Sequence, residues 1–294
     1  MRLTEHTDAL HELVDAGEEA QELVSGLGFT EGPVWDHAND CLLFHDVPGD
    51  ARYRWSEAGG RAQVASPTGK AIGMAFDAQG RLLICHHATS RVTRLEPDGT
   101  TTVLATEYRG DGLNSPNDLV VRSDGLIYFS DPHYGRVDPD HGLPRPMELD
   151  HRGVYALDPD SRELRLLAED FEAPNGLCFS LDESVLFVND SERWHVRRFA
   201  VAPDGSLSGG DVIITTDKPH LGPGNPDGMK LDAEGNVWVS GPGGIWVVTP
   251  EGEHVGVVCF PKQAVNFTWG APNDLYVCAT DSVYRVRTKV RGAR

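Results

Sequence analysis

The stretch Pro174-Asn175-Gly176-Leu177-Cys178-Phe179, followed after a short turn by Val185-Leu186-Phe187-Val188, shows the pattern that decides the fold. Both halves are short apolar runs bounded by turn-forming residues, which is typical of buried β-strands. The residues between them, 180–184, are mostly polar, and short polar connections of this kind join antiparallel strands. The pattern therefore predicts two adjacent antiparallel strands within residues 174–188.

Five more copies of this strand pair occur along the chain, and they begin at Thr30, Ala71, Pro116, Pro226 and Val265. Several copies continue into two further strands, which we expect at 91–96 with 101–105, at 153–157 with 164–168, and at 244–248 with 254–258. Repeated four-stranded units of this size are typical of the blades of a β-propeller. The sequence therefore predicts an all-β, six-bladed β-propeller, with a β-sandwich as the alternative.

The sixth unit lacks an outermost strand, because the chain ends soon after Val286. We expect residues 20–27, which precede the first unit, to supply it. A strand from the N-terminus would close the ring and remove an open sheet edge, which is otherwise a site for unwanted pairing.

Only the N-terminus has a helical pattern. Residues 7–22 place Leu10, Leu13 and Val14 on one face, although Gly17 interrupts that face. We predict a short helical extension over residues 1–22 and a single propeller domain over residues 23–294. The extension would pack on its own propeller or on a second copy, so we expect a monomer or a homodimer.

The composition argues against several classes of protein. The chain has 45 Asp and Glu against 26 Lys and Arg, which gives a net charge of −19. Such a charge repels nucleic acids and anionic membrane surfaces, and it suits a neutral substrate with an acidic product. The five cysteines show no pairing pattern, and we find neither a secretory leader nor a membrane span. We therefore expect a cytoplasmic protein that acts on a small molecule.

One position of the repeat, just before the Gly or its equivalent, is polar in most units. It is occupied by Glu31, Ile72, Asn117, Asn175, Asp227 and, with a register that is open by one residue, Asn266. In a propeller the innermost strands line the central channel, so equivalent positions surround one point on the axis. We therefore expect two carboxylates and at least two carboxamides to converge there.

Two like charges brought together on the axis are costly unless a cation lies between them. Oxygen donors with a total charge of −2 suit Ca²⁺, Mg²⁺ or Mn²⁺ better than a structural Zn²⁺. An Asn beside a Gly is, taken singly, usually a turn residue. The recurrence at one position of the repeat is what favours a divalent metal site.

The motifs resemble those of the gluconolactonase and senescence-marker-protein (regucalcin) family. The resemblance extends from about Leu23 to Val286. It is carried by Phe29-Thr-Glu-Gly-Pro-Val-Trp35, Ser115-Pro-Asn-Asp118, Pro174-Asn-Gly-Leu177, Phe179-Ser-Leu-Asp-Glu183 and Pro226-Asp-Gly-Met229. It implies a six-bladed propeller with one catalytic divalent metal, and hydrolysis of sugar lactones such as gluconolactone.

By motif match, the resemblance places the family's metal ligands on Glu31, Asn117, Asn175 and Asp227. Ca²⁺ is the first expectation, and Zn²⁺, Mn²⁺, Mg²⁺ and Fe²⁺ also occur in the family. In the regucalcin branch, an Arg two residues before the first Asn ligand binds substrate. Ser115 stands there in this chain, so the substrate need not be the sugar lactone of that branch.

Lactone hydrolysis needs a polarised carbonyl, an activated water and a stabilised oxyanion. A metal on the axis supplies the first of these. Asp227 is the expected general base, and direct attack by Asp227 on the carbonyl is the covalent alternative. Asp190 is expected to support the site from the fourth unit. Substrate contacts are expected from Ser115, His133, Tyr134, His87 and Asn266.

Three other functions fit parts of the pattern. A phosphotriesterase on the same scaffold would need the same metal ring. A propeller that binds a protein or peptide would not need the ring. A calcium-binding protein without turnover would use the metal only to fasten the blades. A serine esterase is disfavoured because no GxSxG motif is present.

Overall fold

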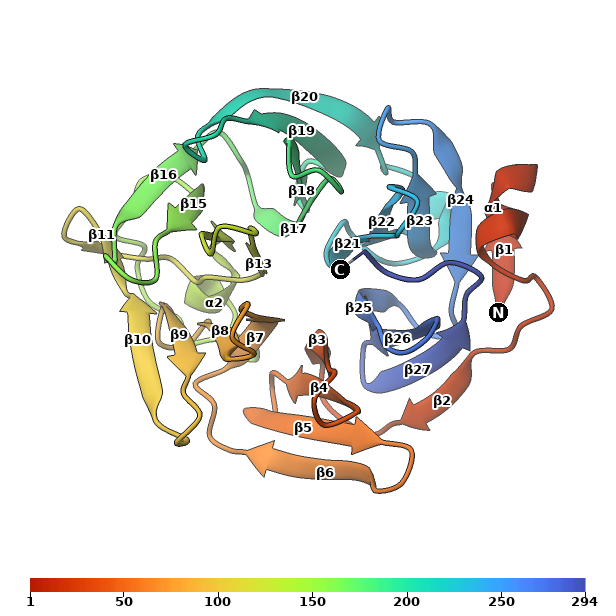
Figure 1. Ribbon diagram of the computed structural model, residues 1–294, viewed down its shortest axis with the longest axis horizontal. Coiled ribbons are helices and arrows are strands. Elements are labelled where there is room, and N and C mark those ends of the chain that lie inside the picture. Colours follow the sequence, from red (N-terminus) through yellow and green to blue (C-terminus); the bar gives the residue numbers. More distant parts are fainter. Residues whose placement is uncertain (294) are drawn as a thin grey trace.

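The computed structural model describes residues 1–293, and it shows six antiparallel sheets arranged around a central axis (Figure 1). We number these sheets as blades 1 to 6 along the chain. The first three blades contain β3 (Thr30–Asp36), β4 (Cys41–Asp46), β5 (Ala51–Ser56) and β6 (Gly60–Ala65); β7 (Ala71–Phe76), β8 (Leu82–His86), β9 (Arg91–Leu95) and β10 (Thr101–Ala105); and β13 (Leu119–Val121), β14 (Ile127–Asp131), β15 (Gly153–Leu157) and β16 (Leu164–Ala168).

The remaining blades follow the same order from the axis outward. They contain β17 (Pro174–Phe179), β18 (Val185–Asp190), β19 (His195–Val201) and β20 (Leu207–Thr215); β21 (Met229–Leu231), β22 (Val237–Gly241), β23 (Gly244–Val248) and β24 (His254–Cys259); and β25 (Ala264–Trp269), β26 (Asp274–Ala279) and β27 (Ser282–Arg287). A small ribbon of β11 (Glu107–Tyr108) and β12 (Asp111–Gly112) follows blade 2. The predicted six-bladed propeller is confirmed.

The ring closes as predicted. The strand β2 (Gln21–Val24) pairs with β27 and completes blade 6 from the N-terminal side. The outermost strand of the last blade therefore comes from the start of the chain, and the two ends of the propeller share one sheet. This arrangement removes the edge that β27 would otherwise expose.

The N-terminus also forms a strand that the sequence did not indicate. The strand β1 (Arg2–Thr4) pairs with β24 and adds a fifth strand to blade 5. The helix α1 (Asp8–Leu13) is shorter than the predicted 7–22, because Val14 already has extended backbone angles. Leu10, Leu13 and Val14 are nonetheless buried together, as expected from their common face. Each contributes about 1.5–3 kcal/mol through burial of apolar surface.

The core consists of apolar layers between neighbouring blades. Tyr128 and Val154 of blade 3, for example, pack against Leu177 and Leu186 of blade 4. This sandwiching buries both faces of each sheet, which explains why the strands read as continuous apolar runs. All five cysteines are buried and unpaired, which agrees with the absence of a disulfide pattern in the sequence.

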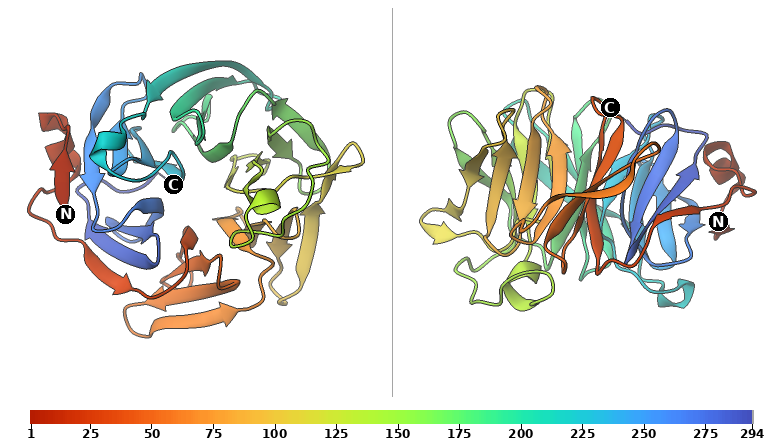
Figure 2. Two further views of the ribbon diagram at one scale, coloured as in Figure 1. Left: turned by 180° about the vertical axis from the view of Figure 1, so that it is seen from behind. Right: turned by 90° about the horizontal axis from the view of Figure 1, so that it is seen from below.

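Two irregular connections lie on one face of the propeller. One follows β14 and contains the helix α2 (Tyr134–Val137); the other precedes β21 and contains the 3-10 helix η1 (Pro219–Leu221). Both lie along the lower edge of the side view in Figure 2. Within residues 1–293, none of the helices has the length and apolar character needed to cross a membrane.

Candidate functional site

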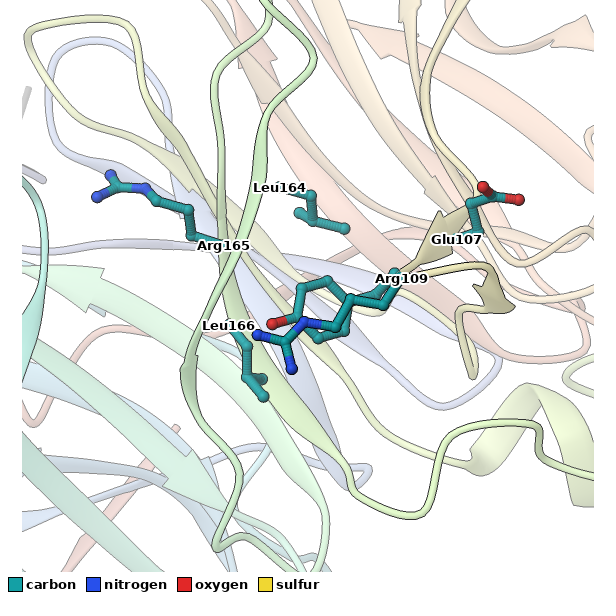
Figure 3. Close-up of a pocket in the computed structure, with 6 residues that line it drawn as sticks. Glu107, Arg109, Leu164, Arg165 and Leu166 are labelled. Atoms are coloured by element: carbon teal, nitrogen blue, oxygen red, sulfur yellow. The ribbon is translucent and has the colours of Figure 1, made fainter.

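A surface hollow of about 530 Å³ lies on the outer rim of the propeller (Figure 3). It is lined by Glu107, Tyr108, Arg109, Leu164, Arg165 and Leu166, which come from β11, β16 and their neighbours. None of the residues singled out in the sequence belongs to this hollow. The polar side chains that the repeat aligns meet elsewhere, on the central axis.

The structure brings the four expected metal ligands together at the starts of the inner strands. The amide Nδ2 of Asn117 donates to Oδ1 of Asn175, and Nδ2 of Asn175 donates to Oγ of Ser191 (3.0 Å). Glu31 lies close enough to Asp227 for their charges to interact. Glu31, Asn117 and Asn175 are buried, whereas Asp227 is partly exposed.

Backbone contacts between neighbouring blades hold these positions together. We call the equivalent positions of the six blades around the axis the ring. The N–H of Gly73 donates to the carbonyl of Asn117 (2.9 Å), and the N–H of Gly176 donates to the carbonyl of Asp227 (3.1 Å). Gly32 packs closest of all, because a Cβ there would lie 1.7 Å from the carbonyl oxygen of Ile72. The Gly that follows the ring position in blades 1, 2, 4 and 5 is therefore needed for close approach of the blades.

The same contacts settle the open register in blade 6. The N–H of Gly228 donates to the carbonyl of Val265 (2.9 Å), just as Gly176 does to Asp227. Val265 is therefore the ring position, and the alignment of Asn266 with that position was wrong by one residue. Asn266 lies one step further along, where its Nδ2 donates to Oε2 of Glu31 (2.9 Å). It holds a ring carboxylate, and a contact with substrate stays a prediction.

The ring is a region of concentrated negative charge. Burial, and then the nearby charge of Asp118, raises the pKa of Glu31 to about 7. Burial, followed by the charges of Glu31 and Asp118, raises the pKa of Asp227 well above its ordinary value. The ammonium group of Lys230 is the opposing charge, and it acts to lower both of these pKa values.

Asp118 and Lys230 were not identified from the sequence. Asp118 directly follows Asn117, at the position where blades 1, 2, 4 and 5 have Gly. A buried carboxylate at that position was therefore visible in the alignment of the six units. Lys230 gave no such signal, because a Lys within a short strand usually faces solvent.

His87 lies next to the ring residue Asn117. It is 1% exposed, and its Nε2 is 3.0 Å from Oδ1 of Asn117. Burial lowers the pKa of His87 to about 4, so the imidazole of His87 is neutral at pH 7. Its Nδ1 is 3.2 Å from the backbone carbonyl of His141. The predicted contact of His87 with substrate is untested, and in this structure the side chain contacts a ring residue instead.

Ser115 is also fully buried. Its hydroxyl donates to the carbonyl of Pro132 (2.6 Å) and accepts from the N–H of Gly135 (3.0 Å). The hydroxyl therefore fastens the start of the connection that carries His133 and Tyr134. A substrate contact by Ser115 stays a prediction.

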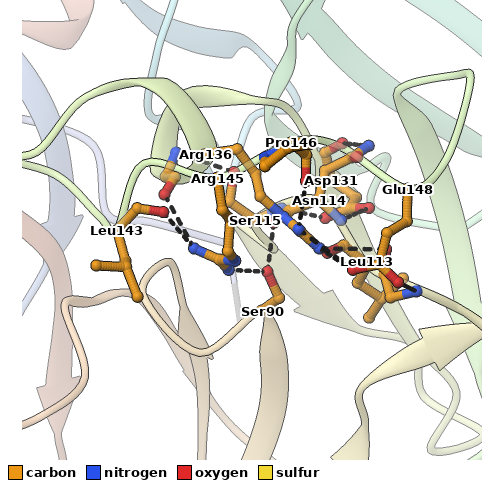
Figure 4. Close-up of polar contacts among 12 residues, drawn as sticks. Ser90, Leu113, Asn114, Ser115, Asp131, Arg136, Leu143, Arg145, Pro146 and Glu148 are labelled. Atoms are coloured by element: carbon orange, nitrogen blue, oxygen red, sulfur yellow. Dashed lines mark hydrogen bonds and ion pairs between the residues drawn. The ribbon is translucent and has the colours of Figure 1, made fainter.

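Two arginines fasten the rest of that connection, residues 132–152. Arg136 donates to the backbone carbonyls of Asn114 (2.9 Å) and Pro146 (2.7 Å), and Arg145 donates to that of Leu143 (2.6 Å) (Figure 4). These charge-assisted bonds to the main chain give the connection a defined shape. The connection of residues 132–152 lies beside the ring, and we call it the wall.

His133 and Tyr134 lie at the start of this wall, with ring centroids 5.0 Å apart. The hydroxyl of Tyr134 lies beside Ser191 and within reach of the charge of Asp227, and burial raises its pKa above the ordinary value. The Nε2 of His133 is 3.7 Å from Glu192, and its Nδ1 is buried without a hydrogen-bond partner. Of these two side chains, Tyr134 is the one that interacts with the charge of the ring residue Asp227.

The fold and the ring together define a six-bladed propeller with a polar centre on its axis. A family model described as "SMP-30/Gluconolactonase/LRE-like region" matches residues 29–281. The gluconolactonase of Zymomonas mobilis is 30% identical over 99% of this chain and 87% of its own length.

Two solved structures are similar over nearly their whole length. A putative gluconolactonase has a TM-score of 0.92 and 33% identity, with full coverage of both chains. A gluconolactonase from Xanthomonas campestris has a TM-score of 0.90 and 32% identity, covering 98% of this chain and 94% of that one. The chain belongs to the SMP-30/gluconolactonase family, and it is a lactonase.

Proposed function

We propose that the chain opens a small, sugar-derived lactone to its hydroxy acid with the help of one divalent cation, Ca²⁺ before Zn²⁺, Mn²⁺, Mg²⁺ or Fe²⁺. Glu31, Asn117, Asn175 and Asp227 would hold the ion. The observation that supports this proposal is that Asn117 contacts Asn175, while Glu31 and Asp227 lie close enough for their charges to interact.

The residues present fit such an ion. Glu31, Asp118 and Asp227 concentrate negative charge at the axis, and Lys230 is the opposing ammonium group. Oδ2 of Asp118 is buried without a hydrogen-bond partner. A divalent cation would relieve this imbalance. Among residues 1–293, no three His, Cys, Asp or Glu side chains gather into a metal site. The proposed ion would therefore take amide oxygens of Asn117 and Asn175 beside the two carboxylates, a set of donors that suits Ca²⁺.

The two ring carboxylates are suited to different tasks. Glu31 is 2% exposed, and its Oε2 accepts hydrogen bonds from Gly32 and Asn266. It is therefore suited to holding an ion. Asp227 is partly exposed, so one of its carboxylate oxygens could hold the ion while the other meets a water. Asp227 takes the proton of the attacking water.

The bound cation would polarise the lactone carbonyl and favour ionisation of a nearby water. Tyr134 keeps its proton at neutral pH, because burial raises its pKa. Its hydroxyl can donate a hydrogen bond to an oxygen of the substrate. His133 adds a second polar side chain on the same wall and helps to orient the substrate.

The charge of the protein agrees with this direction of reaction. The substrate is a neutral lactone, which a net charge of −19 does not repel. The product is a carboxylate, which the same charge disfavours. Release of the acid is therefore assisted by the field of the protein.

The test is hydrolysis of aldonolactones and simple γ- and δ-lactones, measured after chelation and again with each divalent ion restored. Asp227→Asn should lower kcat by about a hundredfold or more. The matched control is Asp217→Asn, which changes an exposed carboxylate in the same connection before β21 and should leave kcat unchanged. The panel includes a phosphotriester. Turnover of that compound in place of every lactone would contradict the proposal.

A further inference from the structure

Three carboxylates recur at the C-terminal end of the second strand in blades 1, 3 and 4. Asp46 ends β4, Asp131 ends β14 and Asp190 ends β18. All three are buried, and Asp131 and Asp190 are completely so. They lie 14 or 15 residues after the ring residue of the same blade, which is Glu31, Asn117 or Asn175.

Each of these carboxylates accepts hydrogen bonds from the same two backbone N–H groups, counted from the ring residue of its blade. Asp131 accepts from Asn114 (2.8 Å) and Ser115 (2.7 Å), which are three and two residues before Asn117 (Figure 4). These bonds use both oxygens of the carboxylate.

Blades 4 and 1 repeat this geometry. Asp190 accepts from Glu172 (2.8 Å) and Ala173 (3.0 Å), three and two residues before Asn175. Asp46 accepts from Gly28 (3.0 Å) and Phe29 (3.1 Å), three and two residues before Glu31. In blade 1 both bonds reach the same oxygen, Oδ1.

The carboxylate occurs only in blades whose ring residue offers oxygen. In blade 2, where the ring residue is the apolar Ile72, the equivalent of Asp46 is His86, which pairs opposite Ala71. Asp227 of blade 5 is supported in another way, by side chains at the end of β18 in blade 4. Ser191 donates to the carbonyl of Pro226 (2.5 Å), and Nδ2 of Asn189 donates to the carbonyl of Asp227 (2.6 Å).

We infer that Asp46, Asp131 and Asp190 are positioning residues, which set the backbone just before Glu31, Asn117 and Asn175 so that these three side chains meet on the axis. The inference rests on the proposed metal site. A carboxylate that binds two successive N–H groups fixes the direction in which the chain enters the inner strand. A ligand two residues later then has little freedom to move away.

Blade 2 provides a matched control. Oδ1 of Asp50 accepts from the N–H groups of Thr68 (2.9 Å) and Lys70 (2.8 Å), just before Ile72. It accepts two main-chain bonds, as Asp46 and Asp131 do, but the ring residue that follows is no ligand. Asp50 has a positive φ of 49°, which Asn tolerates well. Asp50→Asn therefore perturbs the backbone without touching the ion.

The experiment is titration of the whole chain with Ca²⁺ against a chelator, with the melting temperature of each variant recorded. Partners of metal ligands typically change affinity by ten- to a hundredfold when they are substituted. Asp131→Asn and Asp190→Asn should weaken Ca²⁺ binding by about this factor. Asp46→Asn should have a smaller effect, because one oxygen can still accept both bonds. Asp50→Asn should change the affinity less than threefold, even with a similar loss in melting temperature.

Two outcomes would overturn the inference. One is an unchanged Ca²⁺ affinity in Asp131→Asn, and the other is an equal loss in Asp50→Asn. If the unsubstituted protein binds no divalent ion but still opens lactones, the metal proposal fails by itself. The inference is then judged on kcat, which Asp131→Asn should lower at least tenfold and Asp50→Asn should not.

Discussion

The Nζ atom of Lys230 lies 3.6 Å from Oδ2 of Asp118, the residue that follows the ring residue Asn117. Asp118 is buried, and Oδ2 has no hydrogen-bond partner, so this ion pair is what compensates its charge. Glu31 and Asp227 also feel the ammonium group. Lys230 thus stabilises a set of carboxylates that would otherwise need a bound cation.

Lys230→Met should make the protein more dependent on metal. Loss of the ammonium group leaves Asp118 unpaired, which should lower the stability of the metal-free protein by about 1–3 kcal/mol. The same change removes a charge that repels a divalent ion, so Ca²⁺ should bind several-fold more tightly. Both effects are read from thermal unfolding with chelator and with Ca²⁺.

The double variant Lys230→Met with Asp118→Asn is the control for this prediction. It removes both charges, so the metal-free stability should return toward that of the unsubstituted protein. A Lys230→Met protein with the same melting temperature and the same Ca²⁺ affinity as the original would contradict the role assigned to Lys230.

Glu31→Gln should stabilise the metal-free protein more at pH 8 than at pH 5.5. Folding raises the pKa of Glu31 from its ordinary value of 4.5 to about 7. The folded protein therefore keeps a proton that the unfolded chain loses, and stability falls as the pH rises through this range. At pH 5.5 Glu31 is protonated in the folded state, but the unfolded chain already loses its proton, so Gln should have only a small advantage.

Between pH 5.5 and pH 8 this advantage of Gln should grow by about 2 kcal/mol, because the folded protein must then also ionise the buried Glu31. The measurement is the difference in melting temperature between the two proteins, in chelator, as a function of pH. Buried histidines titrate equally in both proteins, so their effects cancel. A difference in melting temperature that does not change between pH 5.5 and pH 8 would show that folding does not raise the pKa of Glu31.

His87→Leu should weaken Ca²⁺ binding about tenfold, because the donor to Oδ1 of Asn117 is lost. His87→Gln keeps an N–H donor and should restore most of the affinity. The matched control is His86→Gln. His86 is also buried, but it bonds Thr68 and Thr93 away from the ring. Equal losses in His86→Gln and His87→Leu would mean that the effect is general destabilisation.

Tyr134→Phe should raise KM for the best lactone several-fold and lower kcat less. The hydroxyl lies beside Ser191 and near Asp227, where a substrate oxygen would be held. Removing one hydrogen bond to a substrate costs about 0.5–1.5 kcal/mol. Tyr53→Phe, which changes a hydroxyl on the outer part of blade 1, is the control. Unchanged kinetics in Tyr134→Phe would remove this residue from the site.

Much of the fold was predictable because each blade repeats one local pattern. Paired apolar runs with polar turns were visible in all six units, and so was the missing strand that residues 20–27 supply. The pairing of β1 with β24 was not predictable, because Arg2, Leu3 and Thr4 form too short a run to show a strand period. The end of α1 at Leu13 depends on packing against the propeller.

The candidate site was predictable where position in the repeat determines it. Asn266 was misaligned because blade 6 has no Gly after its ring position, so the sequence offered Val265 and Asn266 as alternatives. The carboxylates at the ends of β4, β14 and β18 were missed as a set, because they are distant in sequence from the residues that they hold. Only the structure brings Asp131 to the main chain of Asn114 and Ser115.

The most direct test of the central claim is a crystal structure with Ca²⁺, checked by anomalous scattering from crystals in which Mn²⁺ replaces it. The account predicts one ion per chain on the axis, within bonding distance of oxygens from Glu31, Asn117, Asn175 and Asp227. Ca²⁺-to-oxygen distances should be about 2.3–2.6 Å. An ion bound elsewhere, or an empty ring at millimolar Ca²⁺ in an active enzyme, would contradict it.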